Sequence, residues 1–236
     1  MKYVISLLVG LLCGAVLFTF GLFNNPFAAE RGLSPLSVSD SAVTSLSFTR
    51  VPAKSIAYTN NGESRIEPHP KSIAELWNAP VRLTDAMLTE LHNARGKTVG
   101  IGVKFSSRSE KTRILKGKAL VDSVWYVYMP DRGALFIEQS ENYWPFIQDV
   151  FFPAYKNSAN SWKGTWFGDL TDGPGALGIA RVTGVSGAFQ GSIMEAVESM
   201  DVRAYSTSNG PVSAEGRLLI AMPPEVPAAA DVEADE

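Results

Sequence analysis

The chain has 236 residues, of which 45% are hydrophobic and 19% charged, and its formal net charge is -3. These proportions are ordinary for a globular protein with an apolar anchor, and without Lys2 and the acidic tail the body is close to neutral, which argues against nucleic acid as a partner. With one cysteine and two histidines, the chain lacks the side chains of a disulfide scaffold or a usual metal centre, so we predict no metal and no cofactor.

The first element is an uncharged apolar segment, residues 3–23. As a helix it would span roughly 30 Å, which predicts a single transmembrane anchor over residues 1–23. A cleaved signal peptide is the alternative, although Ala28-Ala29 lacks the small residue expected upstream. Lys2 favours a cytoplasmic amino terminus in an inner or plasma membrane, with the main domain extracytoplasmic, which means periplasmic in a bacterium. Gly10 and Gly14 have the spacing of a helix-packing motif.

After the anchor, the composition divides the chain into three further parts. Residues 24–43 are rich in Ser, Pro and Asn and are expected to form a tether. Residues 44–222 have the strand patterns of one domain, and residues 223–236 form a tail rich in Pro and acidic residues that we expect to be disordered.

The front of the domain mixes strand and helix signals. Strand-like runs at 45–51 and 55–59 lead into a hairpin turn at Asn60-Asn61-Gly62. Two short helices are predicted next: one begins at the capping box Ser72–Glu75 and ends before Pro80, and the other runs from Thr84 to Gly96.

From Lys97 onward the period changes to two, which predicts strands. Val99, Ile101, Val103 and Phe105 alternate with small or polar residues, and Pro130–Gly133 predicts a tight turn between two strands. About eight strands joined by short turns indicate a mainly β fold, an antiparallel meander that closes into a barrel. The segments predicted as strands after 105 are 111–128 (one long strand or a bent pair), 134–139, 161–170, 176–183, 194–206 and 212–222.

The sequence contains no recognisable set of catalytic residues. Gly173–Gly178 fits Gly-x-Gly-x-x-Gly but precedes a strand, so it is expected to be a turn. Glu138 would suit acid–base work if it pointed into an apolar barrel, where burial would raise its pKa, but a surface position is the more ordinary one. Residues 93–118 carry eight bases against Glu110 alone, and they form either a solvated face or a surface that contacts anionic lipid headgroups or an acidic partner.

Aromatic density is the most unusual feature of the sequence. Thirteen of the 24 aromatic residues fall between Trp125 and Phe167. A subset lies in a segment broken by Pro145 and Pro153, expected as a loop or short helix that plugs the barrel, lines an apolar pocket, or contacts a membrane or partner. These residues are Tyr143, Trp144, Phe146, Phe151 and Phe152.

The run Gly178-Ile179-Ala180-Arg181-Val182-Thr183-Gly184-Val185-Ser186-Gly187-Ala188-Phe189-Gln190-Gly191 resembles the glycine-rich signature of the allene oxide cyclase and dirigent-like barrels. Val185 and Met194 replace two expected glycines. The resemblance implies an eight-stranded antiparallel barrel in which this motif joins two neighbouring strands, and no catalytic residue is carried over from it.

Three functions follow as hypotheses. The first is a single-span accessory subunit whose β-domain docks on a larger membrane complex. The second is a barrel that binds or transforms an apolar small molecule such as a lipid, pigment or quinone, which a pocket containing Glu138 or Arg181 would favour. The third is a transient assembly factor.

Overall fold

The computed structural model describes residues 2–23, 42–51, 57–60, 63–64 and 84–222. Helix α1 (Lys2–Phe23) has no charged side chain after Lys2 and is mostly apolar, and it is exposed over the residues whose burial is described. It is long and apolar enough to cross a membrane. A signal sequence near an amino terminus can have the same length and composition. The predicted tail, most of the predicted tether and the helix predicted from Ser72 lie outside the described residues.

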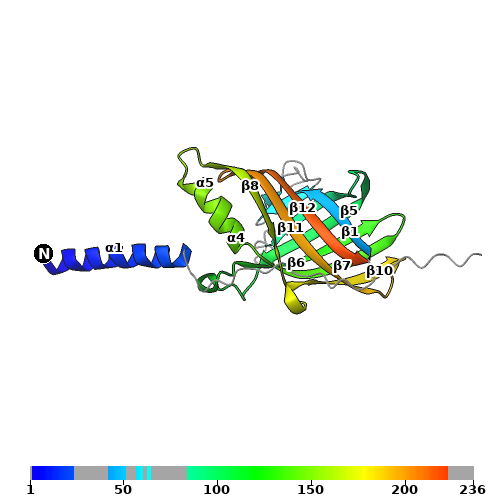
Figure 1. Cartoon of the computed structure of the whole chain (residues 1–236), viewed down its shortest axis with the longest axis horizontal. Coiled ribbons are helices and arrows are strands. Elements are labelled where there is room, and N and C mark those ends of the chain that lie inside the picture. The colour runs from blue at the N-terminus through cyan, green and yellow to red at the C-terminus, as the bar shows by residue number, and fades with distance from the viewer. Residues whose placement is uncertain (1, 24–41, 52–56, 61–62, 65–83, 223–236) are drawn as a thin grey trace, which may run out of the picture.

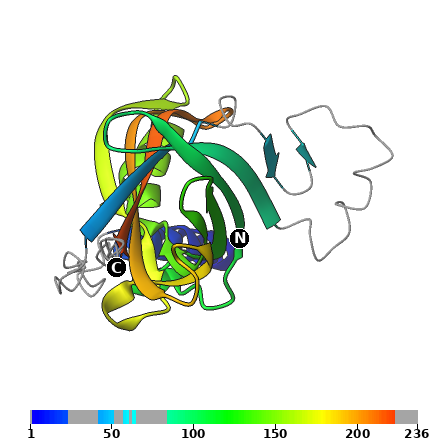
Figure 2. The same cartoon turned by 90° about the vertical axis from the view of Figure 1, so that its right-hand side faces the viewer.

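Eight antiparallel strands form a ring that encloses the core, which confirms the predicted β architecture (Figure 1, Figure 2). Around the ring the order is β1-β12-β11-β10-β7-β6-β5-β4, and Ser47 of β1 pairs with His92 of β4 to return to the start. The ring strands are β1 (Ala42–Thr49), β4 (Thr84–His92), β5 (Thr98–Arg108), β6 (Leu120–Met129), β7 (Gly133–Asn142), β10 (Ala180–Gly187), β11 (Ile193–Ser206) and β12 (Gly210–Met222).

Further elements lie beside this ring. β2 (Ala57–Asn60) pairs with β3 (Glu63–Ser64) and with β4, as expected for a hairpin about Asn60-Asn61-Gly62. Further along, β8 (Ser161–Asp169) pairs with β11 and β9 (Thr171–Gly173) pairs with β7. Helical turns are η3 (Ile114–Lys116), α4 (Trp144–Phe146), the π-helical η4 (Ile147–Phe151), α5 (Phe152–Lys156) and η5 (Ala176–Gly178).

The strand connections define two ends of the barrel. One end carries the turns at 93–97, 130–132 and 188–192, and we call it the closed end. The opposite end carries the loop at 109–119, the helical segment 144–156 and the turn at 207–209, and we call it the mouth end. In Figure 1 the helical segment α4–α5 lies at the left, mouth end, and β10 ends at the right.

The β6–β7 hairpin forms at the turn predicted from Pro130–Gly133. Pro130 and Gly133 bracket the turn, in which the Arg132 amide donates to the Met129 carbonyl at 3.0 Å. The strands then pair from Met129–Gly133 to Leu120–Asn142. β8 also follows the prediction, because Trp162 and Trp166 share one face and lie against Gly164 and Gly168 respectively.

The helix predicted over Thr84–Gly96 is wrong, because residues 84–92 form strand β4 between β5 on one side and β1 and β2 on the other. Met87, Leu88 and Leu91 fit a helical spacing, but neighbouring strands offer backbone partners along the whole segment, and such partners override a weak local preference. The short helices of the described residues lie instead at 144–156, the segment predicted as a loop or short helix.

Two other predicted boundaries move. The long strand predicted over 111–128 is a structured loop followed by β6. The strand predicted over 176–183 begins later and ends later, as β10 over Ala180–Gly187, after the helical turn η5. In β10 the Gly184 position leaves no space for a side chain, since an added Cβ would meet the Phe189 carbonyl oxygen. The chain turns after Gly187, whose φ of +64° suits glycine.

An apolar core fills the closed end of the barrel. Trp125 lies at its centre, fully buried, with its ring edge-on to Phe48 at 4.8 Å and against the bare backbone of Gly102. The remaining buried members come from the β10–β11 turn and from every ring strand except β5, which adds the partly buried Val99. Among them are Leu46, Leu91, Val127, Leu135, Ile137, Val182, Phe189, Leu218 and Ile220. The closed end is therefore packed with side chains.

Candidate functional site

A layer of buried polar side chains lies next to this core on the mouth side. Lys104 of β5, Glu141 of β7 and Glu198 of β11 point into the barrel and are buried. Arg50, which follows β1, reaches the same place. We call these four residues the ion layer.

Glu198 is the hub of the ion layer. The Lys104 ammonium donates to its two carboxylate oxygens at 2.8 and 2.9 Å, and the Trp125 indole N–H donates to Oε2 at 2.9 Å. Arg50 and Gln139 also donate to this carboxylate. Five hydrogen bonds from four side chains thus converge on one carboxylate, which ties opposite walls of the barrel together.

The carboxylate of Glu141 also accepts several hydrogen bonds, on the other side of Lys104. Its Oε1 lies 2.5 Å from the Lys104 ammonium and accepts from Ser123 at 2.5 Å and Gln139 at 2.8 Å. The Tyr143 hydroxyl donates to Oε2 at 2.6 Å and accepts from Arg50 at 3.0 Å. Tyr143 therefore links Glu141 to Arg50.

Burial and neighbouring charge shift the pKa of three of these groups. Burial lowers the pKa of Lys104 from 10.5 to about 7, with Glu141 opposing the shift and Arg50 adding to it. Burial raises the pKa of Glu141, but the charges of Lys104 and Arg50 and the hydrogen bonds from Lys104 and Ser123 outweigh it and lower the pKa to about 2. Burial also raises the pKa of Tyr143 above its ordinary 10, so the phenol keeps its proton.

A cavity of about 290 Å³ opens at the mouth end beyond the ion layer. Arg50, Lys104 and Tyr143 form its polar floor, and the helical segment contributes Phe146 to the wall. The rest of the wall comes from the mouth-end parts of five strands, with Asp85, Met87, Ser106, Val121, Met200, Tyr205 and Pro211. We call it the mouth cavity.

The helical segment is held at the mouth by aromatic contacts. The Phe146 ring lies edge-on to Trp166 and Tyr205, with centroids 5.5 Å away in each case. Val150, on the segment, is fully buried in a cluster with Trp166 and Met200, and the Trp166 indole N–H donates to Asp149 at 3.2 Å. This packing fixes one wall of the mouth cavity.

The aromatic residues singled out in the sequence separate into three groups. Tyr143 and Phe146 line the mouth cavity. Trp144 is buried beside the cavity-lining residues without facing the cavity. Phe151 and Phe152 are half-buried and contact each other, and Phe151 also packs on Tyr205.

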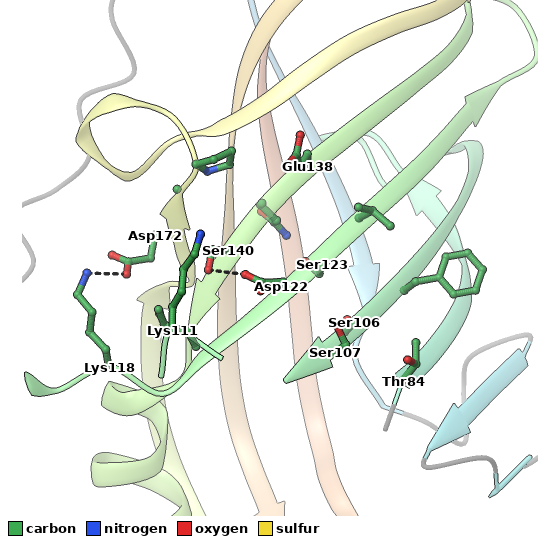
Figure 3. A pocket seen from close by; sticks show the side chains of 16 residues that line it. Thr84, Ser106, Ser107, Lys111, Lys118, Asp122, Ser123, Glu138, Ser140 and Asp172 are labelled. Atoms are coloured by element: carbon green, nitrogen blue, oxygen red, sulfur yellow. Dashed lines mark hydrogen bonds and ion pairs between the residues drawn. The ribbon is translucent and has the colours of Figure 1, made fainter. Parts of the chain in front are cut away.

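Glu138 and Arg181 lie on the outer face of the barrel, paired in register on β7 and β10, and not inside it. Glu138 borders an open groove of about 660 Å³ along β5–β7, the outer groove (Figure 3). Lys118 is paired with Asp172 there at 3.0 Å, and Ser140 donates to Asp122 at 3.0 Å. Three of the five charged side chains that line the groove, Lys118, Asp122 and Asp172, thus have partners within the chain.

Gly10 and Gly14 lie on α1, where an added Cβ would meet nothing within 4 Å. They stay a prediction for packing against another helix. Among the residues that the structure describes, no group of three His, Cys, Asp or Glu side chains is placed to hold a metal ion.

Reasoning from the sequence missed Arg50, Lys104 and Glu198. The available signal was the pattern in β5, where Gly100, Gly102 and Lys104 share one face. That face points inward, because the glycines leave room for Met129 and the Trp125 ring, and the apolar Ile101, Val103 and Phe105 point outward.

No family model matches this chain, and no curated protein is similar to it in sequence. The resemblance to allene oxide cyclase and dirigent-like barrels therefore stays a prediction.

Proposed function

We propose that this protein is a membrane-anchored β-barrel that binds a neutral, mainly apolar small molecule in the mouth cavity. The observation that carries the proposal is a cavity of about 290 Å³ with apolar walls above a polar floor, inside a barrel that is otherwise packed. Cavities near this size, mainly apolar and with a few convergent polar groups, are the usual form of small-molecule sites.

The charge of the floor selects against an anionic ligand. Arg50 and a protonated Lys104 are matched by the carboxylates of Glu141 and Glu198. Loss of the Lys104 proton would leave the ion layer negative, and Asp85 adds a further acid to the wall. A neutral ligand with one hydrogen-bonding group, of the lipid alcohol or quinone type, therefore fits better than a carboxylate.

The wall of the cavity suits an apolar ligand of variable shape. Met87 and Met200 have flexible, polarizable side chains that adapt to different contours. Phe146 and Tyr205 provide ring faces and edges that are fixed by their contacts with each other. The ligand would thus be held mainly by apolar contact.

The anchor places the barrel where such ligands are concentrated. In this proposal α1 spans the membrane once, with the amino terminus cytoplasmic and the barrel extracytoplasmic. Its support is the length and apolar character of the helix.

The test is photolabelling of the full chain in lipid nanodiscs with a long-chain alcohol that carries a diazirine. We expect labelled peptides around Phe146, Met200 and Tyr205, and much less labelling by the matching carboxylic acid. Val121→Trp, which fills the cavity, should abolish this labelling, and Val185→Trp on the outer face should leave it unchanged. Labels confined to α1 and the outer face of the barrel would contradict the proposal.

A second function, docking on a larger membrane complex as an accessory subunit, is favoured by the outer face of β5–β7. Exposed apolar side chains are neighbours there in the strand register, with Ile101 opposite Tyr128 and Tyr126 opposite Phe136. A contiguous exposed apolar patch is typical of a protein interface.

Extraction of the native membrane in mild detergent, followed by sizing, tests this second function. The chain should elute in an assembly much larger than a monomer in its micelle, and Tyr126→Ser with Phe136→Ser should release it as a monomer. Thr183→Ala, on the neighbouring strand of the same face, serves as the control. A wild-type chain that elutes alone would exclude a stable accessory role.

A further inference from the structure

We propose that the mouth end of the barrel rests on an anionic lipid bilayer through the β5–β6 loop, Arg108–Lys118, which we call the mouth loop. The inference rests on the proposed membrane anchoring, and it specifies which end of the barrel faces the lipid. It is carried by the charge, the exposed apolar tip and the fixed shape of this loop.

The mouth loop is strongly basic. It contains five bases and one acid, Glu110. One acid from outside the loop, Asp172, pairs with Lys118 at 3.0 Å. The bases are Arg108, Lys111, Arg113, Lys116 and Lys118, all exposed. Basic residues next to an anionic leaflet are attracted to its headgroups by electrostatics, and several together make the attraction substantial.

Two apolar side chains project at the tip of this basic loop. Ile114 is 46% exposed and Leu115 is 63% exposed, and they stand in the single helical turn η3 between Arg113 and Lys116. Exposed apolar residues flanked by bases are the combination that inserts at a membrane interface, with the apolar groups below the headgroups and the bases among them.

The loop presents this tip in a fixed shape. The Thr112 hydroxyl donates to the Leu120 carbonyl at 3.1 Å and accepts from the Leu120 amide at 3.0 Å. Arg113 and Lys118 exchange two backbone bonds across the neck, at 2.8 and 3.1 Å. Asn142, at the end of β7, accepts from the Ala119 amide and donates to the Gly117 carbonyl. A loop already ordered loses little conformational entropy when it binds.

The closed end lacks this combination of clustered bases and an apolar tip. Ile193 is 82% exposed there, but its neighbours in the chain include Glu195 and no base. The chain that continues from Met222 at this end carries five acids in its last 12 residues. The turn at 93–97 carries Arg95 and Lys97 at this end, but no large apolar side chain stands between them. An anionic surface therefore attracts the mouth end, which combines five bases with an apolar tip, more strongly than the closed end.

The tether allows this orientation even though β1 enters the barrel at the closed end. Residues 24–41 can reach about 60 Å when extended. The longest strand, β11, has 14 residues and would measure roughly 46 Å even if untilted. The chain can therefore run the length of the barrel, which brings the mouth cavity towards the lipid that would supply an apolar ligand.

Depth measurements on the full chain in nanodiscs test the inference. Cys13, the sole cysteine, is replaced by Ser, and an environment-sensitive fluorophore is attached at Leu115→Cys or, as the matched control at the closed end, at Ile193→Cys. Nitroxide lipids in discs of phosphatidylcholine mixed with phosphatidylglycerol should quench the Leu115 probe strongly and the Ile193 probe weakly. In discs of phosphatidylcholine alone, the quenching of the Leu115 probe should fall towards that of the Ile193 probe.

Charge variants make the test quantitative. Lys111→Gln with Lys116→Gln should lower the ratio of docked to undocked protein roughly 30-fold, since each base near an anionic surface is worth about 1 kcal/mol. Arg95→Gln with Lys97→Gln, at the closed end, should leave this ratio unchanged.

Equal quenching of the two probes would overturn the inference, and so would quenching of the Leu115 probe that is the same with and without phosphatidylglycerol. Photolabelling of the mouth cavity is read separately, so a labelled cavity with an unquenched Leu115 probe would overturn this inference and leave the ligand proposal standing.

Discussion

Lys104→Met is expected to lower the free energy of unfolding of the barrel by about 3–5 kcal/mol, because it removes one charge of a buried, hydrogen-bonded group and leaves the other charges uncompensated. Lys104 is within 2.9 Å of both carboxylates, and without it two negative charges would share Arg50 alone inside the barrel. Urea unfolding in mild detergent, followed through the fluorescence of the buried Trp125, measures the loss.

The companion variant Lys104→Met with Glu141→Gln restores the charge balance. Arg50 and Glu198 then remain as one ion pair. The oxygen of the new amide can still accept from Ser123, and its NH2 group takes the place of the oxygen that accepted from Tyr143, so that it donates to the Tyr143 hydroxyl instead. We expect the double variant to be more stable than Lys104→Met by about 1–3 kcal/mol, since buried ionic groups are costly mainly when one partner is missing. A double variant less stable than the single one would contradict the charge argument.

Acid is expected to destabilise the barrel between pH 4.5 and about 2, the window set by Glu141. The pKa of this carboxyl is lower in the folded chain than in the unfolded chain, so the unfolded state takes up its proton first as the pH falls. The stabilisation is fully present above pH 4.5, amounts to roughly 3 kcal/mol, and is lost as the pH approaches 2.

Urea midpoints measured at several pH values across this window give the slope. Glu141→Gln should be less stable at neutral pH and show a clearly shallower dependence in acid. Glu138→Gln, on the exposed outer face of the same strand, should keep the wild-type slope. An unchanged slope in Glu141→Gln would show that other carboxyl groups govern the acid response.

The strands that can be predicted well from the sequence are those that local patterns, alternation and turn residues, define. β6, β7 and β8 each show period two, and the turn at Pro130–Gly133 fixes the register of the first pair. Alternation cannot say which face of a strand is buried. In β5 the inward face consists of glycines and Lys104, since the barrel is narrow and Trp125 already occupies the space.

The candidate site could not be predicted because its members are far apart in the chain. Arg50 and Glu198 are separated by 148 positions, and Lys104 and Glu198 by 94. Only the ring order brings them together. The same topology separates residues that the sequence places together, because β5 carries Arg95 and Lys97 to one end of the barrel and Lys111 to Lys118 to the other, with Lys104 buried between them.

The pairing of β1 with β12 sets the order in which the ring can be completed. All eight residues of β1 pair with β12, whereas its contact with β4 is one bridge. During synthesis the hairpins between β4 and β7 can form as they emerge, but β1 has to wait for the last strand. Ring closure is therefore a late, long-range step that follows translation, and a chain shortened before β12 would leave β1 without its main partner.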